Sequence, residues 1–482
     1  MAKKILSLAL ALVMMVTTLS FTAMAENDVI YPMSVGENNI VYRDGTISGN
    51  VKLNVINNTG EAASAIAVTA IFEKATNSFA GATISDNVTL GKGNTVVTAQ
   101  LPTVTQADGD YVAKIYLWNG KETLVPVAEG LSVDVFETVP VLTGDKDIPE
   151  FANGVYQIEN ANQLAWFSEL IAGTATDESD VAVEADADAN AILVNDIYIN
   201  NPVAEDGSFD EAWYENGASG KTNWYSNGIG RTSAYKGVFD GNSKTVYGMY
   251  VCGARPVGGL FSSVSGGTVK NVNVNSGYVV SENKNPSKSD YNTGASAMVV
   301  GLLSDGTIDG AVASGEITVA GETYSSHLTG GIVANVDGST AVSTVTNCTS
   351  FVDIALGNSA QQTSLPDTNA NGLGGIIGGL KTNKTYKSVV TNNTFCGTID
   401  STKTRVAAGI LAWTVSTHLS NVSGNANYGT ITLGEFAVTN GRYGHIVASY
   451  NYNKDASQQY LTANICEGTF ILPEIEEETP TE

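Results

Sequence analysis

The chain has 482 residues, and 24 lysines and arginines against 49 aspartates and glutamates give it a formal net charge of −25. This acidic excess argues against nucleic acid as a partner, because a phosphate-binding face has to be basic, and equally against docking on an anionic membrane. Three histidines leave little material for a histidine-rich metal site, whereas 50 glycines and 43% hydrophobic residues are typical of a folded chain of strands and turns.

Residues 1–25 have the three parts of an export signal. Lys3 and Lys4 give a positive start, residues 5–16 form an apolar run, and Ala23 and Ala25 are the small residues that signal peptidase needs. The run is shorter than the ~20 residues of a membrane span. We therefore expect cleavage after Ala25, a secreted or extracellular protein that could associate with the cell surface, and no membrane span in the mature chain.

Residues 26–137 are expected to form one domain, in which a period of two runs from about Asn38 to Phe136. Strands are expected at residues 51–56, 66–72, 111–118 and 131–136. Short strands separated by turn residues predict a β-sandwich. The stretch from Tyr111 to Trp118, followed by residues 124–127, resembles the immunoglobulin-like or fibronectin-like modules of bacterial secreted proteins. A linker is expected over residues 138–150, where Pro140, Gly144 and Pro149 interrupt the pattern.

One helix is expected directly after the linker. Asn160 or Asn162 can cap it, and apolar residues recur on one face. We expect this helix to close the open end of the structure that follows. The residues of the apolar face are Leu164, Phe167, Leu170 and Ile171.

The remainder of the chain repeats, which is its most informative feature. Each copy has a glycine followed by two apolar residues, then an apolar unit such as Val269-Lys270-Asn271, then a third segment such as Gly277 with Val279. Successive copies begin 30 to 44 residues apart, so the loops vary in length while the core segments are kept. The glycines that open the copies are Gly259, Gly301, Gly331, Gly375 and Gly409.

Three short strands per repeat, joined by small residues, are what a parallel β-helix requires, because stacked coils build one continuous core. A β-propeller has repeats of similar length but needs four full strands per blade. We therefore predict an all-β protein: an N-terminal β-sandwich followed by a right-handed parallel β-helix (solenoid) of about six coils over residues 151–472, with one capping helix. Residues 473–482 are expected to be an acidic tail.

The segments that open this region carry a family resemblance. Residues 195–199, 224–230, 235–242 and 245–251, followed by Gly258-Gly259-Leu260-Phe261, resemble the unit of bacterial GLUG-motif β-helix proteins. The resemblance implies a β-helix. It says less about function, because such repeats occur in adhesin-like surface proteins and in large proteases that cleave immunoglobulin A.

No catalytic motif is recognisable. The zinc motif of those proteases is missing, since none of His327, His418 and His445 is followed by Glu. β-Helix hydrolases need carboxylates that converge on adjacent coils. Asp353 and Asp400 in the third segments lie at different offsets, as does Glu467, so we expect solvated faces and not a column of carboxylates.

An acidic loop follows the helix and could supply several of the six to eight oxygen ligands that Ca²⁺ takes. It has no glycine at the position where an EF-hand loop requires one, so a solvated loop is the favoured interpretation and no cofactor is expected. The candidate ligands are Asp177, Glu178, Asp180, Asp186 and Asp188.

Aromatic residues cluster ahead of the repeats at Trp213, Tyr214, Trp224 and Tyr225. Exposed flat rings stack on sugar faces, so these residues are the candidate glycan-binding site. Trp224 belongs to the segment that resembles the family and is expected in the core, whereas Trp213 and Tyr214 are expected to be freer. Cys348, Cys396 and Cys466 are expected as buried thiols, because their offsets disfavour disulfides between neighbouring coils.

The sequence thus favours an exported, non-catalytic protein with an adhesin-like binding or spacer role. Its partner would be a glycan or a host, matrix or cell-wall protein. Two alternatives stay open: a carbohydrate-active β-helix enzyme, either a polysaccharide hydrolase or a lyase, and a structural subunit of a larger surface assembly.

Overall fold

The computed structural model describes residues 30–121, 125–204, 208–214, 220–253, 257–282, 295–320, 327–338, 340–356, 371–382, 386, 388–402, 406–414, 421–439, 442–448 and 463–473. The predicted signal peptide and residues 474–482 of the predicted tail lie outside these ranges. The described chain is mostly β and forms two compact units. The first unit comprises Met1–Val139 and Val203–Asp210, and the second comprises Pro140–Pro202 and Glu211–Glu482.

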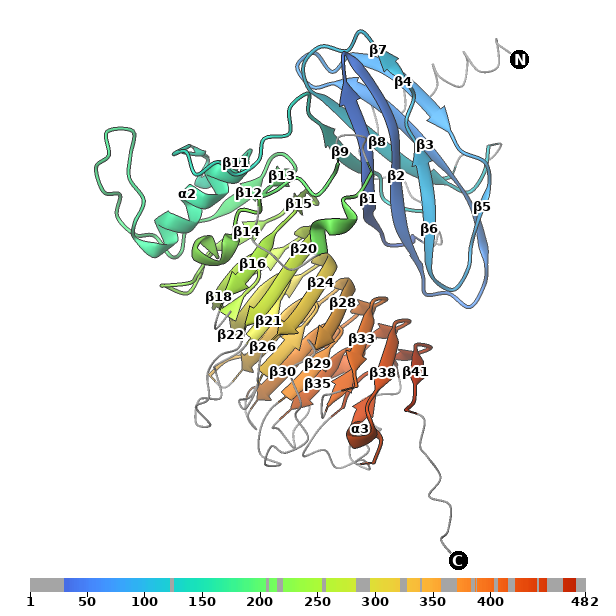
Figure 1. Cartoon of the computed structure of the whole chain (residues 1–482), viewed down its shortest axis with the longest axis vertical. Coiled ribbons are helices and arrows are strands. Elements are labelled where there is room, and N and C mark those ends of the chain that lie inside the picture. Colours follow the sequence, from blue (N-terminus) through green and yellow to red (C-terminus); the bar gives the residue numbers. More distant parts are fainter. Residues whose placement is uncertain are drawn as a thin grey trace, which may run out of the picture. The chain divides into compact units, whose positions relative to one another are not determined.

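The first unit has two antiparallel sheets that share one apolar core (Figure 1). The core exists because alternate residues of each strand point inward, as the period of two predicts. One sheet contains β1 (Met33–Arg43), β2 (Thr46–Asn57), β6 (Gly93–Gln100) and β7 (Val104–Thr105). The other contains β3 (Ala63–Glu73), β4 (Phe79–Ile84), β5 (Val88–Leu90), β8 (Tyr111–Trp118) and β9 (Leu131–Val135).

The second unit consists of four sheets whose strands come from successive repeats in chain order (Figure 1). The nine-stranded sheet contains β10 (Glu150–Ala152), β11 (Val155–Ile158), β12 (Ala191–Leu193), β14 (Val238–Asp240), β19 (Thr268–Lys270), β23 (Thr307–Asp309), β27 (Thr344–Thr346), β31 (Val389–Thr391) and β36 (Asn421–Ser423). The twelve-stranded sheet contains β13 (Ile197–Tyr198), β15 (Thr245–Tyr247), β16 (Tyr250–Gly253), β20 (Asn273–Glu282), β24 (Val312–Ala320), β28 (Thr349–Leu356), β32 (Thr394–Phe395), β33 (Thr398–Ser401), β37 (Ala426–Asn427), β38 (Thr430–Leu433), β40 (Ile465–Cys466) and β41 (Thr469–Ile471).

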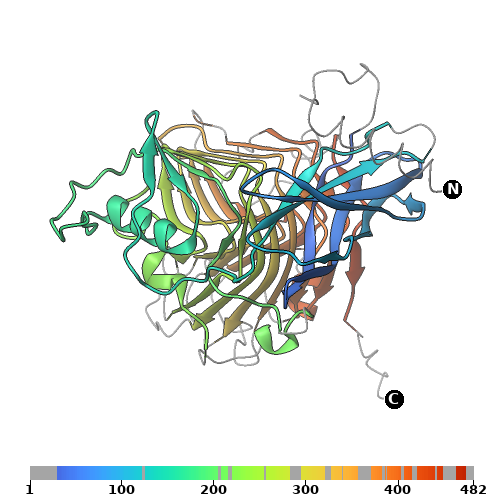
Figure 2. The ribbon, with the colours of Figure 1, turned by 90° about the horizontal axis from the view of Figure 1, so that it is seen from above.

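Two smaller sheets complete the second unit. The six-stranded sheet contains β17 (Val257–Gly258), β21 (Ala295–Ala297), β25 (His327–Gly330), β29 (Asn371–Gly374), β34 (Ala407–Ala408) and β39 (Tyr443–Gly444). The five-stranded sheet contains β18 (Phe261–Ser265), β22 (Val300–Ser304), β26 (Val333–Gly338), β30 (Ile377–Thr382) and β35 (Leu411–Thr414). Apart from the antiparallel pair β10 and β11, neighbouring strands of the second unit pair in parallel, and Figure 2 shows them behind one another.

The repeat segments found in the sequence are brought into register by these sheets. In the nine-stranded sheet, one column of residues is paired from strand to strand, and its members are Val269, Ile308, Val345, Val390 and Val422. In the twelve-stranded sheet, one column of inward residues joins the third segments, and its members are Val279, Ile317, Ile354, Ile399, Ile431 and Phe470. All the members of the first column, and all but Phe470 of the second, are at most 1% exposed, so these apolar columns form the core of the second unit.

The bend after β19, β23, β27, β31 and β36 of the nine-stranded sheet explains why the second segment ends in Asn or Gly. The residue there has a positive φ, which L-residues other than asparagine and aspartate avoid and glycine adopts freely. Five residues hold the position, with φ between 53° and 69°: Asn271, Gly310, Asn347, Asn392 and Gly424.

The bend between the six-stranded and five-stranded sheets holds Gly259, Gly331, Gly375 and Gly409, as the repeat pattern predicts. Space requires glycine there, because a Cβ on Gly375 would lie 2.2 Å from the carbonyl oxygen of Gly409. Gly301 is different. It lies inside β22, and the pairing of the residues on either side places Met298 opposite Gly331, which corrects the alignment of the second repeat.

Helix α2 (Ala161–Ala172) is the helix expected from the sequence. The side chain of Asn160 accepts hydrogen bonds from two backbone amides of the first turn, and Gly173 ends the helix at a φ of 75°. The ring of Phe167 lies 6.1 Å from that of Tyr235, in the core beside the first repeat. The buried apolar face also contains Leu164, Leu170 and Ile171.

Three short helices complete the described elements: η1 (Glu211–Tyr214), η2 (Trp224–Asn227) and α3 (Glu435–Thr439). Within the described residues, no helix combines the length and apolar character needed to cross a membrane.

Candidate ligand-binding face

The outward face of the twelve-stranded sheet carries a row of side chains in register from one repeat to the next. Outward residues alternate with the core column, so each member of the row lies next to an inward apolar residue. The row begins with aromatic residues, continues with two carboxylates and ends with threonines. In order, its members are Tyr250, Tyr278, Glu316, Asp353, Thr398, Thr430 and Thr469.

The aromatic end of the row is covered by the segment around η1. Trp213 is 3% exposed, and its indole Nε1 donates to the carbonyl oxygen of Ser276 over 2.8 Å. The ammonium group of Lys221 donates to the carbonyl oxygen of Trp213 over 2.6 Å. It also lies 5.0, 5.7 and 5.3 Å from the ring centres of Trp213, Tyr250 and Tyr278. These cation–π contacts fasten the segment to the sheet.

Tyr214 lies where this covering segment meets the carboxylates. Its ring is 5.7 Å from that of Tyr278 and nearly perpendicular to it. Burial raises the pKa of the Tyr214 hydroxyl well above its usual range, and the charges of Glu316 and Asp353 raise the pKa further. Burial and Glu316 also raise the pKa of Tyr278 to about 12. Both phenols are therefore neutral at physiological pH.

Glu316 and Asp353 lie directly opposite each other on β24 and β28. Like charges placed this way in a sheet destabilise it. Glu316 Oε1 accepts from the Thr318 hydroxyl over 2.6 Å. Asp353 Oδ1 accepts from the amide and the hydroxyl of Thr398 over 3.0 and 2.6 Å. These bonds hold one oxygen of each carboxylate in place and orient the other.

The sequence pattern did not reveal this carboxylate pair. Asp353, Asp400 and Glu467 form no column, as expected, because Asp400 lies opposite Ala355, two residues beyond Asp353. The partner of Asp353 is Glu316. A signal was present in the sequence, since each of the two acids directly precedes an isoleucine of the core column.

The four aromatic residues predicted as a glycan platform do not form one surface. Trp224 is fully buried, and its indole nitrogen donates to Leu260, as its expected place in the core requires. Trp213 is not the freer residue that the sequence suggested, because neither face of its ring is open for stacking. Tyr225 is partly exposed, but the guanidinium of Arg231 lies 3.6 Å from its ring centre. Among the four, Tyr214 is the residue next to the carboxylates.

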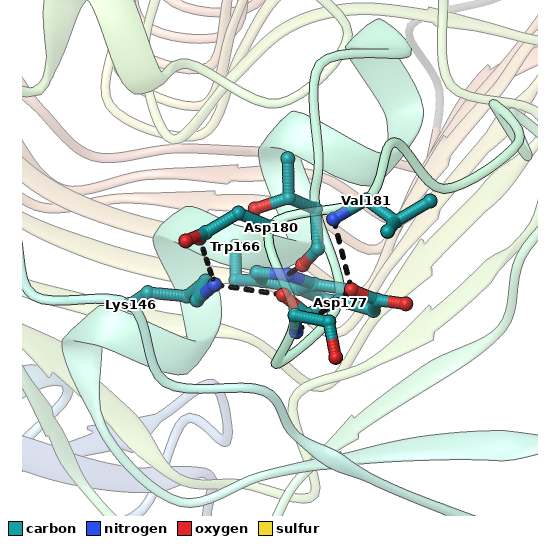
Figure 3. A network of polar contacts seen from close by, with 7 residues as sticks. Lys146, Trp166, Asp177, Asp180 and Val181 are labelled. Atoms are coloured by element: carbon teal, nitrogen blue, oxygen red, sulfur yellow. Dashed lines mark hydrogen bonds and ion pairs between the residues drawn. The ribbon is translucent and has the colours of Figure 1, made fainter.

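The acidic loop after α2 is held by a lysine (Figure 3). The ammonium of Lys146 donates to the carbonyl oxygen of Asp177 over 2.7 Å and to Asp180 Oδ1 over 2.5 Å. The carboxylate of Asp177 accepts from the backbone amides of Ser179 and Val181. The ammonium group of Lys146 therefore supplies the positive charge beside Asp177 and Asp180, which were candidate calcium ligands.

The other candidate ligands of this loop are not gathered around the lysine. Asp186 accepts from the backbone amide of Asp188, and Glu178 is exposed. Within the described residues, no group of three or more His, Cys, Asp or Glu side chains is arranged to hold a metal ion.

Histidines and cysteines have packing contacts where their side chains are described. The ring of His445 lies 4.4 Å from that of Phe470, and burial lowers its pKa. Cys348 is buried, which raises its pKa to about 12. The expectation of buried thiols does not hold for Cys466, which is exposed, and holds only in part for Cys396. The side chains of His327 and His418 lie outside the described set.

Comparison with known proteins adds little. No family model matches this sequence, and no curated protein matches it. A calcium-binding mutant of Bacteroides uniformis β-glucuronidase 2 is 12% identical over 36% of this chain and 24% of that chain, with a TM-score of 0.19. A Bacteroides uniformis β-glucuronidase is 11% identical over 50% of this chain and 27% of that chain, with a TM-score of 0.20. The chain spans about a quarter of these proteins, and TM-scores this low carry no argument.

Proposed function

We propose that the second unit is a right-handed parallel β-helix and the first an immunoglobulin-like β-sandwich, as in bacterial GLUG-motif proteins. Three observations support this proposal: the sheets shared by successive repeats, the inward apolar columns, and the two antiparallel sheets over one core. Parallel strand connections are right-handed in nearly all proteins, which supports the proposed hand.

We propose further that the protein is exported and acts at the cell surface or outside the cell as a non-catalytic, adhesin-like binding protein. The observation that carries this proposal is the outward row from Glu316 through Asp353 to Thr398 and Thr430, beyond the end that the η1 segment covers. Outward residues of a sheet add little to its core, so a continuous polar row across several repeats is available for contact with a partner. The signal-like residues 1–25 support export.

A direct test uses the mature chain beginning at Glu26, immobilised and probed with a glycan array, isolated cell walls and extracellular-matrix proteins. We expect saturable binding to one of these classes. Asp353→Lys should weaken it at least tenfold, whereas Asp309→Lys, a matched reversal on the nine-stranded sheet, should leave it unchanged. Lack of binding to every probe would contradict the proposal, as would recovery of the protein only from the cytoplasm.

A second candidate function, polysaccharide hydrolysis, is favoured by the same carboxylate pair. Neighbouring strands lie about 4.8 Å apart, and retaining glycosidases hold their two carboxyl groups about 5–5.5 Å apart. One carboxyl would protonate the leaving oxygen and the other would attack the sugar. Release of reducing ends that both Glu316→Gln and Asp353→Asn abolish would favour this candidate, and binding without release would favour the first.

A further inference from the structure

We propose that Tyr214, Glu316 and Asp353 form a binding subsite for an uncharged glycan. This inference rests on the proposed function and names the ligand class and the residues of its binding face. The three residues come from η1, β24 and β28, which are far apart in the sequence. The sheet register and the packing of Tyr214 on Tyr278 bring them together.

The arrangement carries a cost that a ligand would offset. Two carboxylates directly opposite each other repel, and cross-strand partners of like charge destabilise a sheet. Lysines lie near other carboxylates of the unit, such as Lys270 beside Asp240 and Lys381 beside Asp337. Within the described residues, no ion pair joins Glu316 or Asp353 to a lysine or arginine.

The hydrogen-bonding groups match hydroxyl donors. The threonine bonds occupy Glu316 Oε1 and Asp353 Oδ1, so the second oxygen of each carboxylate is a pre-oriented acceptor. The neutral hydroxyl of Tyr214 is hydrogen-bonded to the Ser276 side chain and, as a phenol, can both donate and accept. Sugar hydroxyls also donate and accept, and hydrogen bonds to charged groups are stronger than neutral ones.

Charge then selects among glycans. The subsite holds two negative charges within a chain of net charge −25, which repels uronates, sialic acids and sulfated sugars. A divalent cation would find two carboxylates beside a protonated phenol, which is a poor ligand for Ca²⁺ compared with carbonyl or carboxylate oxygens. An uncharged polysaccharide that lies across the strands is not repelled by the carboxylates and needs no metal ion.

Affinity electrophoresis tests this subsite. The mature chain is run through gels containing soluble neutral β-glucan, mannan or galactan, and through gels containing polygalacturonate, each with and without Ca²⁺. We expect retardation by at least one neutral polysaccharide, independent of Ca²⁺. Glu316→Gln and Asp353→Asn should each weaken that binding about tenfold, in line with the loss of a charged hydrogen bond. Tyr214→Phe should weaken it less.

The matched control is Asp309→Asn, which removes one negative charge from the nine-stranded sheet and should leave retardation unchanged. Three results would overturn the subsite: no retardation by any neutral polysaccharide, equal binding by the Glu316 and Asp353 variants and the wild type, or binding only to polygalacturonate or only with Ca²⁺. If the wild type still binds cell walls or a matrix protein in such a case, the proposed binding function stands and only the subsite fails.

Discussion

The early and late repeats of the second unit fill one buried corner position with different chemistry. The position follows the strands of the nine-stranded sheet, and register carries it from one repeat to the next. In the early repeats it holds Val272, Ala311 and Cys348, which belong to the apolar core. In the late repeats it holds Asn393, Asn425 and Asn464. Every member except Asn464 is fully buried.

The asparagines are tolerated because they form a ladder. Asn425 Oδ1 accepts from the backbone and side-chain nitrogens of Asn393, each over 3.0 Å, and its Nδ2 donates to the carbonyl oxygen of Val390 over 2.9 Å. Asn464 makes the same bonds to Asn425 and to the Val422 carbonyl in the next repeat. This corner of a repeat can therefore be stabilised by apolar burial or by a satisfied amide, and a buried amide needs neighbours of its own kind.

The largest expected effect comes from a break in the ladder. Asn425→Leu removes the acceptor of the Asn393 backbone amide and one of the two acceptors of its Nδ2, which keeps only the Val345 carbonyl. It also removes the amide that donates to the Val390 carbonyl, and each orphaned buried group costs about 1–3 kcal/mol. We expect a loss of about 2–5 kcal/mol in the free energy of unfolding. Denaturation followed by tryptophan fluorescence measures it, because Trp166, Trp213, Trp224 and Trp413 all belong to the second unit.

The control for that change lies in the apolar half of the same corner. Cys348→Val introduces the residue that an earlier repeat has at this position, Val272, and keeps the site apolar, so it should cost less than about 1.5 kcal/mol. Equal losses in the free energy of unfolding for Asn425→Leu and Cys348→Val would contradict this interpretation of the corner.

Replacement of all three asparagines tests whether the rungs of the ladder depend on one another. Asn393→Ala, Asn425→Ala and Asn464→Ala should each cost about 1–3 kcal/mol, because each single change orphans partners in the next rung. The triple variant removes donors and acceptors together, so its cost should be lower than the sum of the three by about 1 kcal/mol or more. A strictly additive result in the same denaturation assay would mean that the rungs act independently.

The repeats could be predicted from the sequence because the inward columns require the same residue types in every repeat. The Asn or Gly at the positive-φ bend and the isoleucine of the third segment recur for that reason. The alignment failed at Gly301, where Met298 takes the place of the bend glycine. Local pattern cannot detect such a replacement, because it is decided by how the neighbouring coil packs.

The candidate site was harder to predict, because outward positions are not constrained by the core. The pairing of Glu316 with Asp353 depends on the register between β24 and β28, which are separated in the chain by three other strands and their connections. The burial of Trp213 depends on a segment folding back over β20, which no local periodicity records. Helix α2 was predictable because its cap and its apolar face are local features.

On the outward face of the twelve-stranded sheet we expect a smaller change in the free energy of unfolding, and here the substitution should stabilise the protein. Glu316→Gln removes the repulsion from Asp353 and keeps the shape of the side chain, so it should stabilise the protein by about 0.2–1 kcal/mol. The same variant should bind its glycan less well, which would place the carboxylate pair under selection for binding and not for stability. A loss of stability in the denaturation assay would contradict this interpretation.

The smallest effect is expected at the acidic loop, where every group is close to solvent. The hydrogen bond and the charge of Lys146 lower the pKa of Asp180 below its usual value of 3.8. A carboxylate with a depressed folded-state pKa contributes its stabilisation above the unfolded pKa and loses it as pH falls through the folded value. The bond from the Asp177 amide to the Val181 carbonyl closes this loop over 2.9 Å.

Hydrogen exchange at the Asp177 amide should therefore be slow at pH 5 and above and should lose protection at pH values below 3.8, after correction for the intrinsic rate. In Asp180→Asn the protection should already be reduced at pH 7, though not abolished, since Lys146 still binds the Asp177 carbonyl. Asp188→Asn, in the same loop but away from the lysine, is the control. Equal protection in Asp180→Asn and the wild type would mean that the backbone alone closes the loop.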